Sequence, residues 1–159
     1  MMPGSGRSGQ AASLTGMQRF SSIVLVDARG WVLLQERDEH PVIDPEMWGF
    51  VGGHVDDGEE YLAAAYRELA EETGLHLDGG LECFGVFPVQ HTHADDLDEL
   101  SLYVMRADLT DDDIVLGEGR QIVFVDPATV TDLPLTVAAR QVLPGFLASA
   151  TYRRLAAGP

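Results

Sequence analysis

Residues 53–75 read GHVDDGEEYLAAAYRELAEETGL, and this stretch decides how the rest of the chain is interpreted. Apolar side chains recur in it at helical spacing, which predicts a helix over Glu59–Thr73 with one buried stripe. The stripe consists of Leu62, Ala65, Tyr66, Leu69 and Thr73. Gly74 follows the last of these and is expected to end the helix, because glycine readily adopts the left-handed conformation of a helix C-terminus.

Three glutamates of this helix, Glu68, Glu71 and Glu72, stand at positions i, i+3 and i+4 and therefore cluster on one flank. One interpretation is a solvated acidic face. Like charges at this spacing repel by a few tenths of a kcal/mol per pair, and a bound divalent cation would relieve the repulsion. Hard oxygen ligands of this kind select Mg²⁺ or Mn²⁺. The cluster is therefore a candidate metal site.

The wider spacing gives this helix a family resemblance. The order is Gly53, five residues, Glu59, seven residues, Arg67-Glu68-Leu69, one residue, Glu71-Glu72, one residue, Gly74-Leu75. This pattern resembles the signature of the Nudix hydrolases at every defined position, although Val51 stands where the family commonly has proline before its glycine pair. The resemblance implies an α/β (α+β) fold, an α/β/α sandwich with a mixed sheet flanked by helices.

The resemblance also implies a reaction. Nudix hydrolases cleave the phosphoanhydride bond of a nucleoside diphosphate linked to another group X, by attack of water on phosphorus with Mg²⁺ or Mn²⁺ as cofactor. By position in the family motif, Glu68, Glu71, Glu72 and the main-chain carbonyl of Gly53 are the expected metal ligands. The positions of Glu59 and Arg67 match the pair that ties the loop to the helix in the family, which is a structural role.

The general base is less constrained, since its source varies within the family. Glu71 is one candidate inside the motif, and a carboxylate of a later loop is the alternative. Glu118, between Gly117 and Gly119 just before an expected strand, is the best of the later carboxylates, and Glu99 and Asp98 are weaker ones. An ordinary exposed turn residue is the competing interpretation of Glu118.

Candidate substrate contacts lie outside the motif. Arg37 ends an expected strand ahead of the glycine pair and would meet phosphates, with a surface salt bridge as the alternative. Trp48 and Phe50 are candidates for stacking on a base, or else for core packing. His91 and His93 alternate on one strand, which suggests a second metal or substrate contact or simply a polar strand end.

The chain is expected to form a flexible tail over residues 1–18 and a single Nudix hydrolase domain over residues 19–156. Residues 1–18 are rich in Gly, Ser and Ala without periodicity. β-rich runs predict strands at Phe20–Val26, Trp31–Arg37, Leu81–Gln90, Leu100–Ala107 and Gln121–Val125, with a short apolar piece at Trp48–Val51. A second helix is expected over Thr136–Ala150, interrupted or started near Pro144.

Composition restricts the partners. The 159 residues hold 10 arginines, no lysine and 26 acidic residues, a formal net charge of −16. A basic footprint for a nucleic-acid polymer is absent, so no nucleic-acid partner is expected, and the small-molecule nucleotide substrate is what the family resemblance implies. Apolar runs are too short to span a membrane, and no secretory signal is seen, so a cytoplasmic location is expected. The lone cysteine, Cys83, is expected to be a buried thiol.

Two other functions compete with hydrolysis. A nucleotide-sensing or regulatory module on the same fold would bind without turnover, although such modules often have a damaged motif and this one is intact. Isomerisation of an isoprenyl diphosphate, also found on this fold, relies on a catalytic cysteine, and Cys83 does not stand where that resemblance requires it. The resemblance further suggests a homodimer, since many relatives pair.

Overall fold

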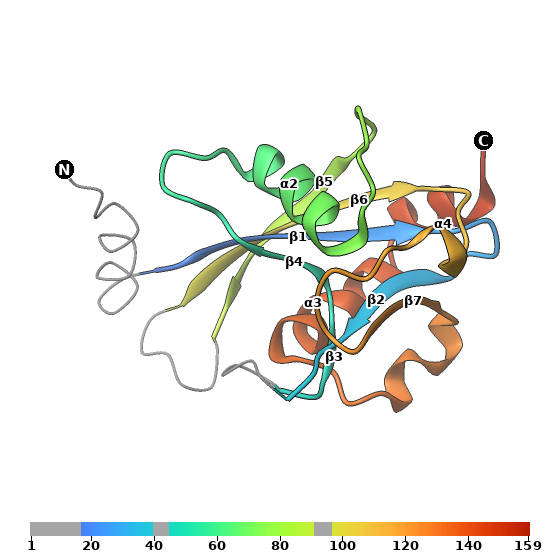
Figure 1. Cartoon of the computed structure of the whole chain (residues 1–159). Helices are drawn as coiled ribbons and strands as arrows, with labels where there is room; N and C mark the ends of the chain where they lie inside the picture. Colours follow the sequence, from blue (N-terminus) through green and yellow to red (C-terminus); the bar gives the residue numbers. More distant parts are fainter. Residues whose placement is uncertain (1–16, 40–44, 91–96) are drawn as a thin grey trace.

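The computed structural model describes residues 17–39, 45–90 and 97–159 (Figure 1). The strands are β1 (Arg19–Val26), β2 (Val32–Glu36), β3 (Trp48–Gly49), β4 (Val51–His54), β5 (Glu82–Val89), β6 (Asp98–Arg106) and β7 (Gln121–Val125). The helices are α2 (Tyr61–Thr73), α3 (Val137–Leu147) and α4 (Ala150–Ala157), with short 3₁₀ turns η1 (Asp111–Asp113) and η2 (Pro127–Asp132). Most of the tail predicted for residues 1–18 lies outside the described residues. His91, for which a substrate contact is predicted, also lies outside them. Among the described residues, no helix has the length and apolar character needed to cross a membrane.

The strands form a mixed sheet, as the sequence predicts, and their order is β3-β2-β1-β6-β5, with β4 paired to β1 and β7 to β2. β1 and β6 pair in parallel from Arg19 opposite Glu99 to Val26 opposite Arg106, and the other pairings are antiparallel. The other edge of β1 is shared: its first half pairs with β4, whereas Val26 at its end pairs with β2. The sheet therefore forks along β1, and the β3–β4 segment crosses from one branch to the other.

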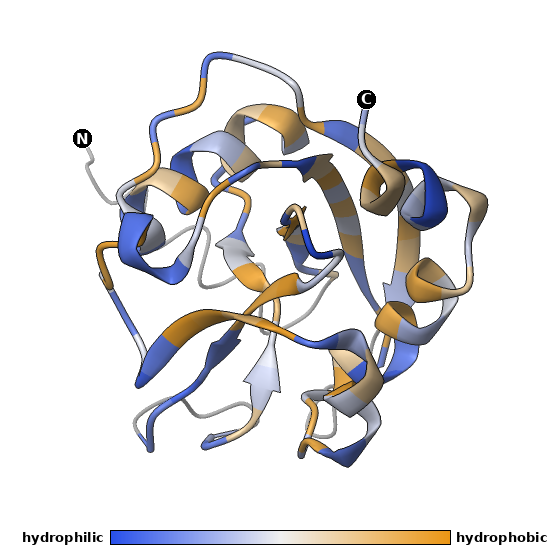
Figure 2. Ribbon diagram, turned by 90° about the vertical axis from the view of Figure 1, so that its right-hand side faces the viewer, coloured by the Kyte–Doolittle hydropathy of each residue, from blue (hydrophilic) through white to orange (hydrophobic). Residues whose placement is uncertain are grey.

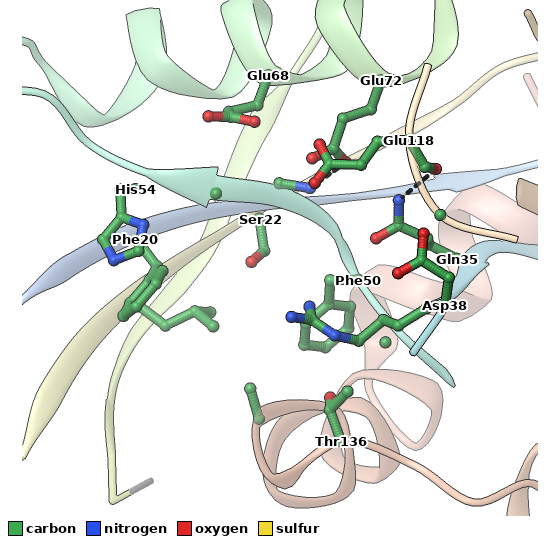
Figure 3. Close-up of a pocket in the computed structure, with 17 residues that line it drawn as sticks. Phe20, Ser22, Gln35, Asp38, Phe50, His54, Glu68, Glu72, Glu118 and Thr136 are labelled. Carbon is green, nitrogen blue, oxygen red and sulfur yellow. Dashed lines mark hydrogen bonds between the residues drawn. The ribbon is translucent and has the colours of Figure 1, made fainter. Parts of the chain in front are cut away.

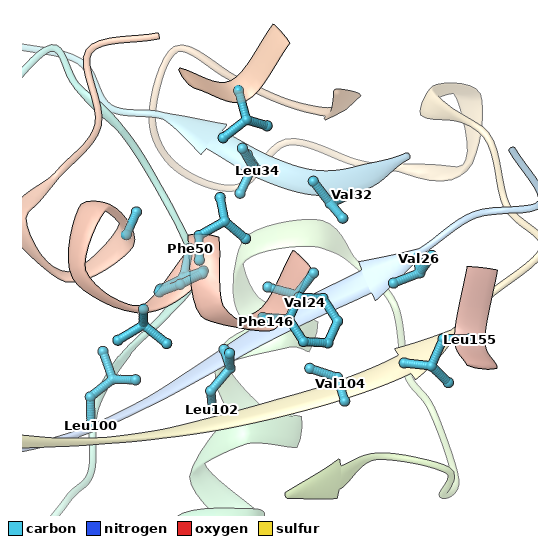
Figure 4. Close-up of a cluster of buried hydrophobic side chains, with 14 of the residues drawn as sticks. Val24, Val26, Val32, Leu34, Phe50, Leu100, Leu102, Val104, Phe146 and Leu155 are labelled. Atoms are coloured by element: carbon cyan, nitrogen blue, oxygen red, sulfur yellow. The ribbon is translucent and has the colours of Figure 1, made fainter. Parts of the chain in front are cut away.

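Helices cover both faces of the sheet, which confirms the α/β/α sandwich. Alternate residues of β1 point to opposite sides, so Ile23 packs with Leu69 of α2 and Val24 belongs to the cluster around Phe146 of α3 (Figure 4). The continuous apolar run of β1 follows from burial on both faces. Hydropathy colouring shows hydrophobic segments along the strands and mixed colours on the helices that cover them (Figure 2).

The motif helix begins at Tyr61, two residues later than predicted, and ends at Gly74, whose φ of 76° confirms the left-handed C-terminus. The predicted buried stripe is wrong at Leu62, which is 43% exposed, and Tyr66 is only partly buried. Burial instead runs through Ala65, Leu69 and Glu72. The helix is thus rotated so that an acidic side chain, rather than Leu62, faces the sheet.

Two further expectations need correction. Cys83 is exposed rather than buried, because β5 is an edge strand. The last helical segment is not one helix from Thr136 to Ala150 but two: α3 is capped by the Thr136 side chain and contains Pro144, and α4 starts after the capping residue Ser149. The strand β4 through the glycine pair was also not anticipated as a separate element.

Candidate active site

The glycine pair of β4 brings the main chain directly against the carboxylates of α2. Gly52 has a φ of 147°, and a Cβ there would lie 2.2 Å from the Ser21 carbonyl oxygen, so only glycine fits. Its N–H donates to Glu72 Oε1 at 3.1 Å. A Cβ on Gly53 would lie 2.6 Å from Glu68 Oε2. Both glutamates therefore reach the β4 backbone because no side chain intervenes.

Glu72 is a buried carboxyl group with no cationic partner among the described residues. Its residue is 5% exposed, and no arginine of the described ranges forms an ion pair with it. Burial raises the pKa of Glu72 to about 8, the Gly52 N–H opposes this, and repulsion from Glu68 and Glu118 adds to it. Burial also raises the pKa of Glu68, against the effect of Arg67. Among the described residues, Glu68 thus has Arg67 as a cationic partner at 3.0 Å, whereas Glu72 has none.

Arg67 of α2 and Glu59 of the preceding loop form the opposite arrangement, a carboxylate with a cationic partner. The guanidinium donates from Nε and Nη2 to the two Glu59 carboxylate oxygens, at 2.8 Å each, and Nη2 also donates to the His54 carbonyl at 3.0 Å. The Arg67 hydrogen bonds lower the pKa of Glu59 to about 2. This pair links the loop that precedes α2 to the middle of the helix.

Glu118 reaches the site from a loop attached to the C-terminal end of α2. The Val115 N–H donates to the Thr73 carbonyl at 2.9 Å and the Gly117 N–H to the Glu72 carbonyl at 2.8 Å. From the sheet side, Gln35 Nε2 donates to the Glu118 carbonyl at 2.9 Å, drawn as a dashed line in Figure 3. In that view the Glu118 side chain lies beside Glu72. The loop therefore adds a third carboxylate to the pocket.

These groups line a pocket of about 610 Å³ at the fork of the sheet. Of the residues singled out from sequence, the structure brings together Arg37, Phe50, Gly53, Glu68, Glu72 and Glu118. Others do not line it. The Glu71 side chain is 59% exposed and contacts Arg67, and Trp48 packs against the hydrophobic core. Asp98 accepts a hydrogen bond from the Gln18 main chain, and Glu99 from the Tyr61 hydroxyl.

Sequence reasoning missed several lining residues: Phe20, Ser22, Gln35, Asp38, His54, Leu100, Thr136 and Ala138. Only Gln35 carried a local signal, since it is a polar residue directly after the buried run Val32–Leu34. The others come from β1, the loop after β2, β4, β6 and the start of α3, and only the sheet pairings bring them to one place.

The donor set suits a hard divalent cation. In the described part of the chain no group of three acidic, histidine or cysteine side chains converges as a ready-made metal cage. Mg²⁺ does not require one, because it is usually held by one or two carboxylates while water and substrate phosphates complete its shell. Glu68 and Glu72 supply two carboxylates beside the unobstructed Gly53 main chain, and the ionised form of Glu72, which burial disfavours, has no cationic partner within the described residues.

Comparison with known proteins agrees with the fold. The NUDIX domain profile matches residues 17–146. Among solved structures, the MutT protein from Methanosarcina mazei Go1 superposes with a TM-score of 0.69 at 19% identity, covering 82% of this chain and 92% of that one. The NUDIX domain of Shewanella oneidensis NrtR, crystallised with ADP ribose, gives 0.66 at 19% identity, covering 91% and 96%.

Curated relatives match over shorter segments. The m7GpppN-mRNA hydrolase NUDT17 of Xenopus laevis is 52% identical over 46 residues, 29% of this chain and 16% of that protein. The RNA pyrophosphohydrolase of Caulobacter vibrioides is 47% identical over 53 residues, 33% and 30% of the two chains. The matched segments are thus less than a third of either relative's length.

A mixed sheet between helices, together with the match of the NUDIX domain profile, defines the class: a NUDIX-domain protein, similar over part of its length to proteins named RNA pyrophosphohydrolase. The chain belongs to the Nudix hydrolase family, as the match over residues 17–146 shows and as the motif from Gly53 to Leu75 predicted.

Proposed function

We propose that this protein is a Mg²⁺-dependent pyrophosphohydrolase of small-molecule nucleotides, acting on a nucleoside diphosphate linked to a group X. The proposed substrates are nucleoside triphosphates, oxidised nucleotides or nucleotide sugars. The observation that carries the proposal is Glu72, a buried carboxylate that lines a solvent-open pocket with no cation of the described chain beside it. A buried charge of this kind is costly unless a ligand compensates it.

Glu68, Glu72 and the Gly53 carbonyl would hold the metal, with Glu71 as a further carboxylate at the exposed side of the helix. A bound divalent cation supplies Lewis acidity and neutralises phosphate charge. In this proposal the Gly52 N–H orients Glu72 by its hydrogen bond, and Arg67 orients Glu68 from the other side at 3.0 Å. The chain thus holds both carboxylates in place before substrate arrives.

Glu118 is the proposed general base, since its carboxylate lines the pocket beside Glu72. It would accept the proton of the attacking water as the oxygen bonds to phosphorus and the phosphoanhydride bond breaks. Glu71, the other candidate base, contacts Arg67 and does not line the pocket. Glu118 therefore has the better geometry for this role.

The remainder of the pocket supports a nucleotide. Arg37 lines it with a buried Nε that makes no hydrogen bond within the described residues, and we assign it to the substrate phosphates. Phe50 contributes apolar surface for the base, and Trp48 would act only indirectly, from the core. His91 stays an untested candidate for substrate contact. Net charge −16 disfavours a long polyanion relative to a small nucleotide.

The test is a phosphate-release screen in Mg²⁺ and in EDTA, with Glu72→Gln as the control. The panel contains nucleoside triphosphates, oxidised nucleotides, nucleotide sugars and dinucleotides, together with triphosphorylated and capped RNA because of the named relatives. A Mg²⁺-dependent rate on a small nucleotide that Glu72→Gln abolishes is the expected result. A rate that survives EDTA contradicts the proposal, and preference for RNA overturns its substrate class.

The alternative is a catalytically silent nucleotide-sensing module. Calorimetric binding of a nucleotide in Mg²⁺ without turnover, by a protein that remains folded, would favour it. We also propose a cytoplasmic location and a homodimer, which fractionation of cells and sedimentation of the purified protein would test.

A further inference from the structure

We propose that Gln35 is a positioning residue, which fixes the loop of residues 115–119 so that Glu118 faces the carboxylates of α2. The inference rests on the proposed role of Glu118 as general base and adds a residue that the motif does not contain. It concerns the hydrogen bond from Gln35 Nε2 to the Glu118 carbonyl, at 2.9 Å.

Gln35 stands where an apolar side chain would be expected. It is 5% exposed and follows the fully buried run Val32–Leu34 of β2, with Gly49 of β3 and Ile122 of β7 as its register partners. A buried primary amide costs free energy unless it is hydrogen-bonded. The Gln35 Nε2 group donates to the carbonyl of Glu118, which is distant in sequence, so the amide links the sheet to the loop of residues 115–119.

The loop is shaped to receive the Gln35 amide. Gly119 has a φ of 88°, and a Cβ there would lie 2.9 Å from Gln35 Nε2 and 3.0 Å from the Glu36 carbonyl oxygen. The Arg120 N–H donates to the same Glu36 carbonyl at 2.8 Å. The main chain therefore runs directly over Gln35, and any side chain at position 119 would push it away.

Glu118 is held from two sides. On one side the Gly117 N–H donates to the Glu72 carbonyl at 2.8 Å, and on the other Gln35 bonds the Glu118 carbonyl. Val115 and Leu116 of the same loop are exposed, so apolar packing contributes little to its order. Removal of the Gln35 bond should therefore loosen Glu118 while the metal-binding carboxylates on α2 stay in place.

The first experiment measures amide hydrogen exchange by mass spectrometry on Gln35→Leu without metal or substrate. Exchange should rise about tenfold over residues 115–120, as expected from the loss of one buried hydrogen bond, and stay unchanged over α2. Gln121→Leu is the matched control, because Gln121 Nε2 bonds Glu36 at 2.8 Å but lies at the surface, and it should alter neither segment. Unchanged exchange in Gln35→Leu overturns the inference.

The second experiment measures kinetics. Gln35→Leu should lower kcat about tenfold with KM within about twofold, and should cost nothing further in a Glu118→Gln background. A rise in KM at unchanged kcat would instead mean that Gln35 contacts the substrate, which overturns the inference. Gly119→Ala attacks the same contact from the loop and should reproduce the exchange and kcat changes if Gln35→Leu does not fold.

Failure of the inference is distinguishable from failure of the proposed function. If the wild-type protein hydrolyses no substrate, the hydrolase proposal fails, and the exchange comparison alone decides whether Gln35 holds the loop. If Glu72→Gln is inactive but Glu118→Gln keeps full kcat, hydrolysis stands and the positioning role is overturned.

Discussion

Two glutamates, Glu59 just before helix α2 and Glu72 within it, lie in opposite electrostatic environments. Glu59 is bound by both arms of the Arg67 guanidinium, and its pKa falls to about 2. One turn beyond Arg67, Glu72 is buried without a described cationic partner, and its pKa rises to about 8. The first carboxylate is stabilised by an arginine of the chain, whereas the second has only the Gly52 N–H as its described hydrogen-bond donor. The difference separates an ion pair within the chain from the carboxylate that we propose as a metal ligand.

The largest expected effect follows from replacing Glu72, the buried carboxyl group that has no described cationic partner. Glu72→Gln keeps an oxygen for the Gly52 N–H but loses a metal ligand, so we expect kcat to fall on the order of 10³-fold, as for loss of one preorganised electrostatic group. Steady-state kinetics in Mg²⁺ measures it, and circular dichroism checks the fold. Glu59→Gln is the control and should lose less than about tenfold. Equal losses of kcat in the two variants would mean that Glu72 is no more important for catalysis than Glu59.

The stabilisation of the fold by added Mg²⁺ should depend on Glu72 but not on Glu59. At 100 times the dissociation constant, a ligand stabilises the folded state by about 2.7 kcal/mol, which corresponds to roughly 5–10 °C in Tm for a chain of this size. We expect this gain when Mg²⁺ is added to the wild-type protein or to Glu59→Gln. Glu72→Gln should show almost none. A gain in Glu72→Gln equal to that of wild type would place the cation elsewhere.

The Glu59–Arg67 pair should affect stability with a defined pH dependence. Because the folded-state pKa of Glu59 is depressed to about 2 from 4.5, its stabilisation is present above pH 4.5 and disappears as the pH falls through 2. Both side chains keep some solvent contact, so Glu59→Gln should lower the free energy of unfolding by only about 1 kcal/mol at pH 7.

Urea unfolding of the two proteins at pH 7, 4 and 2.5 measures this difference. The gap between wild type and variant should narrow at each step. A gap that stays constant across the series would mean that packing, rather than charge, accounts for the Glu59 contribution.

The smallest effect is expected at Glu71. Its side chain is 59% exposed and its described ion pair is with Arg67 at 3.3 Å, so its charge is screened by solvent. Glu71→Gln should lower kcat by less than about tenfold, well below the loss in Glu72→Gln. Kinetics of both variants on one substrate decides the order. If Glu71→Gln loses as much kcat as Glu72→Gln, the exposed carboxylate of Glu71 would be as important a metal ligand as Glu72.

The sequence predicted the parts of the site that depend on local spacing. Glu68, Glu72 and Gly53 lie within one motif, and helical periodicity alone brings the two glutamates to one flank. Glycines on both sides of Glu118 marked it as a turn residue, although only the structure shows the turn against the end of α2.

Non-local contacts account for what sequence reasoning missed. Gln35 and Thr136 meet in one pocket only because of the strand order. Cys83 was assigned to the core because its neighbours are apolar, and the edge position of β5 exposes it. The helical spacing of apolar residues predicts that Leu62 is buried, because it places carboxylates such as Glu72 at the solvent side. In the structure Glu72 faces inward instead, and Leu62 is exposed.

The fork along β1 has a consequence for synthesis of the chain. β1 is made first, yet its parallel partner β6 aligns Glu99 with Arg19, and β7, which completes the branch through β2, begins only at Gln121. Native pairing is thus dominated by long-range contacts, which slow folding. A nascent chain must therefore keep the β6-facing edge of the apolar run Ile23–Val26 open until β6 has left the ribosome, whereas β2 and β4 emerge earlier and pair with its other edge. This open edge is where chaperone binding or premature aggregation would be concentrated.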